Sequence, residues 1–406
     1  MATEAPREVS DLLVIGGGVM GRFTAYEAAG RGARVVVLEQ GRVGDPATAS
    51  YGRTRSFRND YLDPAYARLA HEAFNLWRAF EERTSTEVLV GCGCLNIAKR
   101  SVTPDLDATY AQRSHATLQG LGLRTEALDR DALRRRLPDL DADLGRLDVD
   151  AGVVDLPAVT RTLTRELAAR GVATHEGVET LAIEPDGGGL RVRTDAGSFL
   201  TRSLVVTAGH GTNEVLSRLA GCGLQVPITR DRPSEARYFF PPDQARERFA
   251  SPAMPVVAYL DAGIYCHPIV PGLVDAVKIG YYNPPDVPRG TTSVDSIASF
   301  VARCMPGLQD VPSREVQDVD QCDYDLVADD EFVLGRIPGF ANAFVGVGWR
   351  GTGYKFAPWI GRVLAELALQ EGTVYDINRF NPARFVDEGI TSHEPSIAED
   401  PRPAPV

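Results

Sequence analysis

Three glycines near the N-terminus have the spacing that can hold a pyrophosphate. Gly16, Gly18 and Gly21 fit the pattern G-x-G-x-x-G. In this pattern the first glycine allows a tight turn, the second lets the backbone approach a pyrophosphate, and the third lets helix and strand pack closely. Glu39 follows, and its carboxylate can accept hydrogen bonds from both ribose hydroxyls but would repel a 2′-phosphate. These residues predict a dinucleotide site and argue against NADP.

The elements around these residues are the ones that such a site needs. Residues 12–15 form a short apolar run of strand type, residues 23–30 can form a helix, and residues 33–38 read as a second buried strand that ends at Glu39. This order of strand, glycine loop, helix, strand and acid is the context that the fingerprint requires. The N-terminus of the helix offers N–H groups and a positive dipole end to an anion. The alternative, a glycine turn that binds nothing, leaves the second strand and its acid unexplained.

Length and composition predict an ordinary globular enzyme. The 406 residues exceed one compact core, so about two domains are expected. The formal net charge of −12 disfavours nucleic acid and anionic membranes as partners. The polar N-terminus does not resemble a signal peptide, and no apolar run approaches the roughly 20 residues of a membrane span. We therefore expect a cytoplasmic protein, and its length is compatible with a monomer.

The cysteines do not predict a metal centre. Of the six, only Cys92 and Cys94 lie close together, and no second pair stands at the spacing of a zinc site. In the cytoplasm they are expected to stay reduced.

Signatures of a nucleotide domain recur along the chain with different material between them. Strands are predicted at 91–98, 198–201, 204–209 and 343–347, and residues 225–320 are strand-like and rich in proline and aromatics. This pattern predicts an α/β fold, in which a Rossmann-like domain assembled from separated pieces carries an inserted α+β substrate domain on a mainly antiparallel sheet. The predicted pieces are 9–85, 150–220 and 321–385 for the first domain, and 86–149 and 221–320 for the second.

Several longer motifs carry a family resemblance that covers nearly the whole chain. They are IGGGVMG, SYGRTRSFRNDY (50–61), DAVKIGYY (275–282), QCDYDLVADDEFVLG (321–335) and GVGWRGTGYKFAPWIG (346–361). With these motifs the chain resembles flavin-dependent amine oxidases of the D-amino-acid-oxidase superfamily, in particular monomeric sarcosine oxidase and N-methyltryptophan oxidase. The resemblance implies that the dinucleotide is FAD, and that a small-molecule amine and O₂ are the reactants.

The resemblance also implies how the flavin is held. Cys322 stands where these oxidases attach the flavin through an 8α-thioether, and Arg55 matches an arginine near the flavin ring that could lower the pKa of the thiol. A free buried cysteine beside tightly bound FAD is the alternative. The complete set of expected cofactor contacts is Gly16, Gly18, Gly21, Glu39, Ser50, Arg55, Val178, Cys322, Gly351, Gly353 and Lys355.

Lys278, Arg55 and Tyr324 are the catalytic residues that the resemblance implies. Lys278 matches a lysine that faces the flavin where oxygen reacts, and a fixed ammonium stabilises the charge of developing superoxide. The flanking residues, Val277 and Ile279, leave open whether a lysine in this strand faces solvent or the site. Tyr324 stands two residues after Cys322, as a tyrosine of the family does.

The substrate residues form a second implied group. Arg58 and Lys355 match a pair that clamps a carboxylate, which a guanidinium can grip with two N–H donors. Because Arg53 and Arg55 lie close to Arg58, a generally basic loop is the alternative. Tyr265 and Tyr282 are expected to line the pocket. Tyr282 and Tyr51 both stand where sarcosine oxidase has histidines, which alters polarity and size around the substrate.

Together these residues predict an FAD-dependent oxidase of a secondary or primary amine that carries a carboxylate. Substrate identity stays open among N-methyl amino acids, cyclic imino acids, and the cyclic or aromatic amino acids of specialised biosynthesis. The rival classes are a dehydrogenase that passes electrons to a carrier and a non-catalytic flavin-binding subunit. Lys278 argues against the first rival, and the presence of Lys278, Arg58 and Lys355 together argues against the second.

Overall fold

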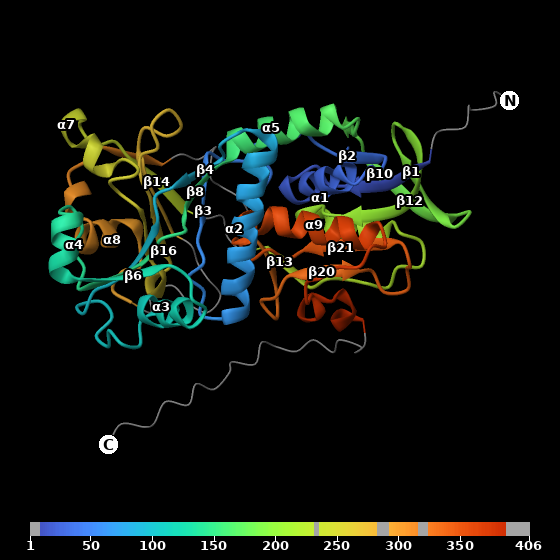
Figure 1. Cartoon of the computed structure of the whole chain (residues 1–406). Helices are drawn as coiled ribbons and strands as arrows, with labels where there is room; N and C mark the ends of the chain where they lie inside the picture. Colours follow the sequence, from blue (N-terminus) through green and yellow to red (C-terminus); the bar gives the residue numbers. More distant parts are fainter. Residues whose placement is uncertain (1–8, 231–234, 282–291, 316–323, 387–406) are drawn as a thin grey trace, which may run out of the picture.

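The computed structural model describes residues 9–230, 235–281, 292–315 and 324–386. Figure 1 shows two lobes with the long helix α2 (Pro64–Thr84) between them. Most of the described strands belong to two eight-stranded sheets, one in each lobe, and the others form a three-stranded and a two-stranded sheet. The mixed α/β architecture agrees with the prediction.

The first sheet has a parallel centre in the order β21-β12-β1-β2-β9. Its strands are rich in valine and leucine because both faces are covered, as is usual for parallel sheets. The strands are β1 (Ser10–Ile15), β2 (Val35–Glu39), β9 (Ala173–Glu176), β10 (Thr180–Asp186), β11 (Gly189–Thr194), β12 (Gly197–Val206), β20 (Val333–Arg336) and β21 (Ala343–Val347).

Helices α1 (Val19–Gly30), α5 (Leu156–Ala169) and α9 (Ala357–Ala368) share one hydrophobic core with this sheet. Helices α1 and α9 approach closely because Gly361 has no side chain: a Cβ there would lie 2.5 Å from Cβ of Phe23. This contact fixes the direction in which α1 leaves the glycine loop.

The second sheet has the order β18-β14-β17-β16-β15-β5-β7-β6 and is antiparallel except between β15 and β5. It therefore matches the mainly antiparallel sheet that the sequence predicts. The strands are β5 (Cys94–Ala98), β6 (Thr125–Asp129), β7 (Leu144–Asp148), β14 (Glu235–Phe239), β15 (Val256–Tyr259), β16 (Ile264–His267), β17 (Val277–Tyr281) and β18 (Ser313–Glu315).

The remaining elements connect the lobes or cover them. Strands β3 (Thr54–Phe57) and β4 (Leu89–Gly91) both pair with β8 (Gly152–Asp155), and β13 (Ile228–Arg230) pairs with β19 (Asp325–Val327). The other α-helices are α3 (Tyr110–Gly120), α4 (Arg130–Arg136), α6 (Thr212–Ser217), α7 (Asp243–Arg246) and α8 (Ile297–Cys304). Short 3₁₀ helices span Gly209–Gly211, Glu247–Phe249, Leu260–Ala262, Pro306–Leu308, Gly353–Phe356, Asn378–Phe380 and Pro382–Phe385.

Two strand predictions were wrong. Residues 91–98 do not form one strand: the chain turns at Gly93, whose φ of +78° is in the left-handed region, and β4 and β5 join different sheets. Conversely, residues 198–201 and 204–206 belong to the single strand β12. Thr201 and Ser203, at the predicted gap, are buried with partners, because Thr201 donates to the carbonyl of Ser203 and Ser203 donates to that of Ala368.

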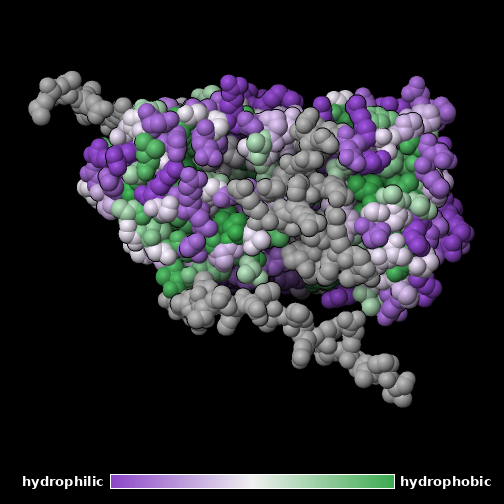
Figure 2. Space-filling model, turned by 180° about the vertical axis from the view of Figure 1, so that it is seen from behind, coloured by the Kyte–Doolittle hydropathy of each residue, from purple (hydrophilic) through white to green (hydrophobic). Residues whose placement is uncertain are grey.

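The strands of the two large sheets come from the segments predicted for the two domains, while the domain boundaries themselves stay a prediction. Figure 2, which views the opposite face, shows hydrophilic residues spread over both ends of the molecule and hydrophobic residues in smaller patches. Across the described ranges, no helix is both long and apolar enough to cross a membrane.

Candidate active site

A cavity of about 490 Å³ lies where the carboxyl ends of the first sheet's parallel strands meet the second sheet. The loops after β1, β2, β12 and β21 line it, and so do Tyr265 and His267 of β16. Ligands of open parallel sheets bind at the carboxyl ends of the strands. The volume falls within the roughly 300–1,000 Å³ that is usual for ligand and cofactor sites.

The glycine loop enters this cavity in the conformation that the fingerprint predicts. Gly16 has φ of +108°, and a Cβ there would lie 2.4 Å from the carbonyl oxygen of Thr207. At Gly21, a Cβ would lie 2.1 Å from the carbonyl oxygen of Gly16. Gly16 and Gly18 line the cavity, whereas Gly21 acts through the packing of α1 against the loop.

Replacing Gly21 with alanine is expected to abolish binding of the dinucleotide. The new methyl group would meet backbone atoms, which cannot rotate away, so the loop must shift. The matched control is Gly30→Ala in the same helix, where a Cβ would meet nothing within 4 Å. The measurement is the flavin absorbance retained by each purified protein. Equal flavin content in the two variants would contradict this role of Gly21.

Glu39 is held in position at the edge of the cavity by backbone donors. Its Oε2 accepts from the N–H of Gly17 at 2.8 Å, and its Oε1 accepts from that of Gly41 at 2.8 Å. Val178, which we predicted to contact the cofactor, supports Glu39 from behind: its N–H donates to the carbonyl of Glu39, and its side chain is buried outside the cavity lining. Ser50 lines the cavity and accepts from the N–H of Val19, the first residue of α1.

These features fit a dinucleotide. Gly18 lines the cavity and has no side chain, so a pyrophosphate can approach its backbone, and a Cβ there would lie 3.2 Å from the Ser50 hydroxyl. Tyr354 also lines the cavity, and its buried hydroxyl has no hydrogen-bond partner among the described residues. A bound ligand can supply that partner, because buried polar groups are rarely left unpaired.

The loop after β21 brings two predicted glycines to the cavity. Gly351 has φ of +64°, and a Cβ there would lie 2.6 Å from the ring of Tyr324. A Cβ at Gly353 would lie 2.4 Å from Cβ of Trp349. Both glycines are thus required for aromatic rings to pack on the loop, a packing reason that the sequence did not reveal.

Arg58 and Lys355, predicted to clamp a carboxylate, both line the cavity and meet at Tyr61. The Lys355 ammonium donates to the Tyr61 hydroxyl at 3.0 Å and to the carbonyl of Thr352 at 2.9 Å. The guanidinium carbon of Arg58 lies 5.0 Å from the centroid of the Tyr61 ring. Burial lowers the pKa of Lys355, and the Arg58 cation adds to this effect. For Tyr61, burial raises the pKa, but the Lys355 and Arg58 cations outweigh it and the pKa is lowered.

Arg58 is not an isolated cation, because Asp60 neutralises it from within the protein. Its Nη1 donates to Oδ1 of Asp60 at 2.6 Å, while Nδ2 of Asn96 donates to the other carboxylate oxygen at 3.0 Å. Burial lowers the pKa of Arg58, but the Asp60 carboxylate outweighs burial and raises it. The arginine therefore stays charged at the wall of the cavity, in an orientation that Asp60 sets.

A second buried acid, Asp148, lies behind this pair. It accepts hydrogen bonds from the backbone N–H and the side-chain amide of Asn59. Burial, and then the charge of Asp60, raises the pKa of Asp148 to about 7, although the donors on Asn59 favour the carboxylate. Asp148 is thus an acid that titrates near neutral pH and that contacts Asn59, the residue between Arg58 and Asp60.

The stability of the protein is expected to fall between about pH 4 and pH 7 through Asp148. In the folded protein this acid holds its proton up to about pH 7, whereas in the unfolded chain it loses it near its ordinary value of 3.8. The unfolded state therefore binds fewer protons over this range, and the free energy of unfolding falls as the pH rises. Asp148→Asn should flatten this fall in urea titrations at pH 4.5, 5.5 and 7. The exposed Asp107→Asn is the control, and parallel slopes for Asp148→Asn and the wild type would contradict the assignment.

Lys278 is buried rather than exposed at the surface, and it is not among the residues that line the cavity. It is paired with His267 across β16 and β17, and its Nζ lies 5.6 Å from the centroid of the Tyr265 ring. The Tyr265 ring lies over Gly280, where a Cβ would be 2.1 Å from the ring. Lys278 therefore shares a sheet face with residues of the cavity wall. Arg55 lines the cavity and donates to the carbonyl of Tyr51 at 2.8 Å.

Some predicted residues lie outside the described part of the chain, namely Cys322 and Tyr282. The cysteines that are described, Cys92, Cys94, Cys222, Cys266 and Cys304, are not paired in disulfides. In the same described part, no cluster of three or more His, Cys, Asp or Glu side chains could hold a metal ion.

The sequence reasoning missed several residues of the cavity and its support: Ser56, Asp60, Asn96, His267 and Asp325. Ser56 and Asp60 lie inside the motif at 50–61, but their types alone do not distinguish them from loop residues. Asp325 lines the cavity and accepts from the N–H of Gly348 at 3.0 Å, and burial raises its pKa to about 6. Asn96 and His267 gave no signal, because strands far apart in the chain bring them to the site.

Known proteins resemble this chain along nearly all of its length. Peroxisomal sarcosine oxidase of Homo sapiens is 29% identical over 404 residues, which cover 95% of this chain and 98% of that protein. Monomeric sarcosine oxidase of Streptomyces avermitilis is 28% identical and covers 92% and 97%. Among solved structures, NikD, an unusual amino acid oxidase essential for nikkomycin biosynthesis, superposes with a TM-score of 0.72 at 25% identity and covers 92% and 98%.

The family termed DAO, FAD dependent oxidoreductase, matches residues 11–367. This range includes the glycine loop, both large sheets and the loop that carries Lys355. The match confirms the resemblance inferred from the sequence motifs and the expectation that the dinucleotide is FAD. The chain is a member of the FAD-dependent oxidoreductase family DAO.

Proposed function

We propose that this enzyme is an FAD-dependent oxidase of a secondary or primary amine that carries a carboxylate. The observation that carries the proposal is the pair Arg58 and Lys355 at the wall of the cofactor cavity, joined through Tyr61. Asp60 neutralises the charge of Arg58, and the ammonium of Lys355 then leaves one net positive charge at this wall. That charge suits a substrate with one carboxylate. The sarcosine oxidases and the amino acid oxidase that resemble the chain support the same reaction class.

When bound, FAD would supply the redox chemistry of an oxidase, that is, hydride transfer from the C–H bond next to the substrate nitrogen and reduction of O₂, with an imine and H₂O₂ as products. The residues of this chain have other tasks. Arg58 and Lys355 orient the substrate through its carboxylate, and Tyr265, Tyr324 and Trp349 surround it and limit the access of water. Orientation alone can supply a large share of the reduction in barrier.

An anaerobic experiment tests the proposal. The yellow protein is mixed with N-methyl amino acids, cyclic imino acids and aromatic amino acids, and the flavin absorbance is followed. Bleaching by one class would establish amine oxidation and identify the substrate class. Addition of O₂ then separates an oxidase from a dehydrogenase, because an oxidase yields one H₂O₂ for each substrate consumed. Flavin that stays oxidised with every amine would refute the proposal.

A cyclic or aromatic amino acid is the second candidate substrate class. The aromatic side chains at the cavity favour it, and so does the likeness to NikD, whose described role is in biosynthesis. We further propose a monomeric cytoplasmic enzyme without nucleic-acid or membrane partners. Sedimentation of the flavin-loaded protein tests the oligomeric state.

We also propose that Cys322 binds the flavin covalently. Cys322→Ser should then release all flavin into the supernatant after acid precipitation, whereas the wild-type precipitate stays yellow. Cys222→Ser, which replaces a partly exposed cysteine outside the cavity lining, is the control and should behave as the wild type does. A Cys322→Ser precipitate that remains yellow would exclude the linkage.

A further inference from the structure

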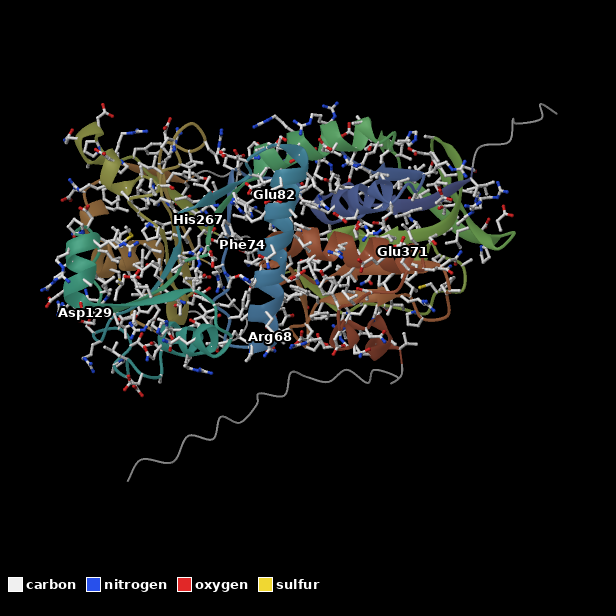
Figure 3. The ribbon with its side chains drawn as sticks, in the orientation of Figure 1. Arg68, Phe74, Glu82, Asp129, His267 and Glu371 are labelled. Carbon is white, nitrogen blue, oxygen red and sulfur yellow. The ribbon has the colours of Figure 1, made fainter. Side chains whose placement is uncertain are left out.

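A buried histidine joins the second sheet to strand β3 at the cavity. His267, the last residue of β16, is 2% exposed and lines the cavity. Its Nδ1 lies 2.8 Å from the hydroxyl of Thr54, and its Nε2 lies 2.7 Å from the hydroxyl of Ser56. In Figure 3 His267 lies among the strands beside α2, well away from Asp129 at the outer edge of its lobe.

Ser56 places one end of this hydrogen-bonded chain at the cavity. Ser56 lines the cavity, and so does Arg58, two residues later. Because both side chains line one cavity, a ligand whose carboxylate binds Arg58 can place its amine near the Ser56 hydroxyl. The His267 imidazole contacts that hydroxyl at 2.7 Å.

The proposed reaction needs a proton acceptor at this place. An aliphatic amine enters mostly as the ammonium at neutral pH, but only the neutral amine has a lone pair that can assist departure of a hydride from the adjacent carbon. The carboxylates that line the cavity are otherwise engaged: Glu39 accepts from the N–H groups of Gly17 and Gly41, and Asp325 accepts from that of Gly348. Glu214 of helix α6, a third lining carboxylate, forms an ion pair with Arg218 at 2.7 Å.

We propose that Ser56 and His267 together take the proton from the substrate ammonium, an inference that rests on the proposed function. The N–H bond of the ammonium breaks and its proton moves to Oγ of Ser56, while the proton of Ser56 moves to Nε2 of His267. The nitrogen keeps the electron pair, the imidazole becomes imidazolium, and its Nδ1–H donates to Thr54. Ser56 is the residue that contacts the substrate, and His267 acts through it.

The groups that face His267 make this transfer transient. Lys278 is its partner on β17, the Tyr265 ring centroid lies 5.1 Å from that of the imidazole, and Arg55 stands between Thr54 and Ser56 on β3. The two nearby cations oppose a lasting imidazolium, so the proton returns through the Ser56 hydroxyl to water of the cavity once the product has left. Lys278 and Arg55 also repel the positive charge of a bound ammonium. This repulsion favours loss of the proton from the substrate.

The test is the rate of flavin reduction under anaerobic conditions at pH 7 and at pH 10, for the wild type, Ser56→Ala and His267→Gln. At pH 7 both variants should be slower by about 10²-fold, the lower end of what positioned acid–base groups contribute. At pH 10 much more of the substrate arrives already neutral, so the variants should approach the wild-type rate. The double variant should be no slower than either single one, because the two residues act in one path.

His115→Gln is the matched control. His115 is also buried and its Nδ1 also lies 2.8 Å from a threonine hydroxyl, that of Thr125, but it belongs to α3 outside the cavity lining. It should leave the pH profile unchanged. The flavin content and the affinity for propionate, followed through flavin absorbance, should be the same in all variants if the cavity is intact.

The outcomes separate this inference from the proposed function. If amines reduce the wild-type flavin but the variants are equally slow at both pH values, Ser56 and His267 have a structural role and the proton path is refuted. Unchanged rates at pH 7 would refute it as well. If no amine reduces the wild-type flavin at either pH, the proposed function and this inference fall together.

Discussion

Reoxidation of the reduced flavin by O₂ is expected to slow by about 10²–10³-fold when Lys278 is replaced with methionine, the effect of removing one preorganised group that stabilises a developing negative charge. Lys278 is 1% exposed, and its partner on β16 is His267, which lines the cavity. In such surroundings an ammonium stabilises superoxide far more than it would in water. Methionine keeps a similar unbranched side chain and removes the charge together with the N–H donors.

The two half-reactions must be measured separately by stopped flow. Reduction of the flavin by the substrate should change much less than reoxidation, since the first electron transfer to O₂ is the step that creates the new anion. Lys99→Met is the control: this lysine pairs with Asp141 outside the cavity lining. Equal slowing of both half-reactions would show that Lys278 has a general structural role.

The second large effect is expected at the carboxylate clamp. Loss of a hydrogen bond to a charged group costs about 1.5–3 kcal/mol, which corresponds to a fall of roughly 10- to 100-fold in kcat/KM. Lys355→Met should show this fall for an amine that carries a carboxylate. The same amine as its methyl ester should lose much less, because the ester has no charge for Lys355 to bind. The comparison of acid and ester separates loss of the clamp from general damage to the cavity.

Arg58 needs a gentler substitution than alanine. Removing its charge would leave the buried carboxylate of Asp60 without a counter-charge, with only the Asn96 amide as a partner, and an uncompensated buried charge is strongly destabilising. Arg58→Lys keeps the cation near Asp60 but loses the planar fork that grips a carboxylate. We expect kcat/KM for the acid to fall with little change in flavin content or thermal stability. A variant that treats acid and ester as the wild type does would contradict the clamp.

The local elements could be predicted from the sequence because their signals lie within a few residues of one another. The glycine spacing, the apolar runs of β1 and β2 and the acid at Glu39 form one continuous segment, and the structure builds them as expected. The family motifs extended this to FAD and to the residues that line its cavity, among them Arg55, Arg58, Tyr265 and Lys355. The limits of strands were misjudged at Gly93, where one residue of positive φ separates β4 from β5, and at β12, whose two predicted pieces form one strand.

What the tertiary structure decided is how charges and hydrogen-bonding groups from distant segments meet. A side chain's type does not reveal its partners when they come from another strand: Asp60 meets Asn96 of β5, and His267 of β16 meets Thr54 and Ser56 of β3. Burial likewise depends on the packed sheets, which is why Lys278 is enclosed and the pKa of Asp148 rises to about 7. The dinucleotide motif could be recognised in the sequence because its glycines, its two strands and Glu39 lie within one short segment. The charges and hydrogen bonds around the substrate part of the cavity depend on strands that are far apart in the chain and meet only in the folded protein.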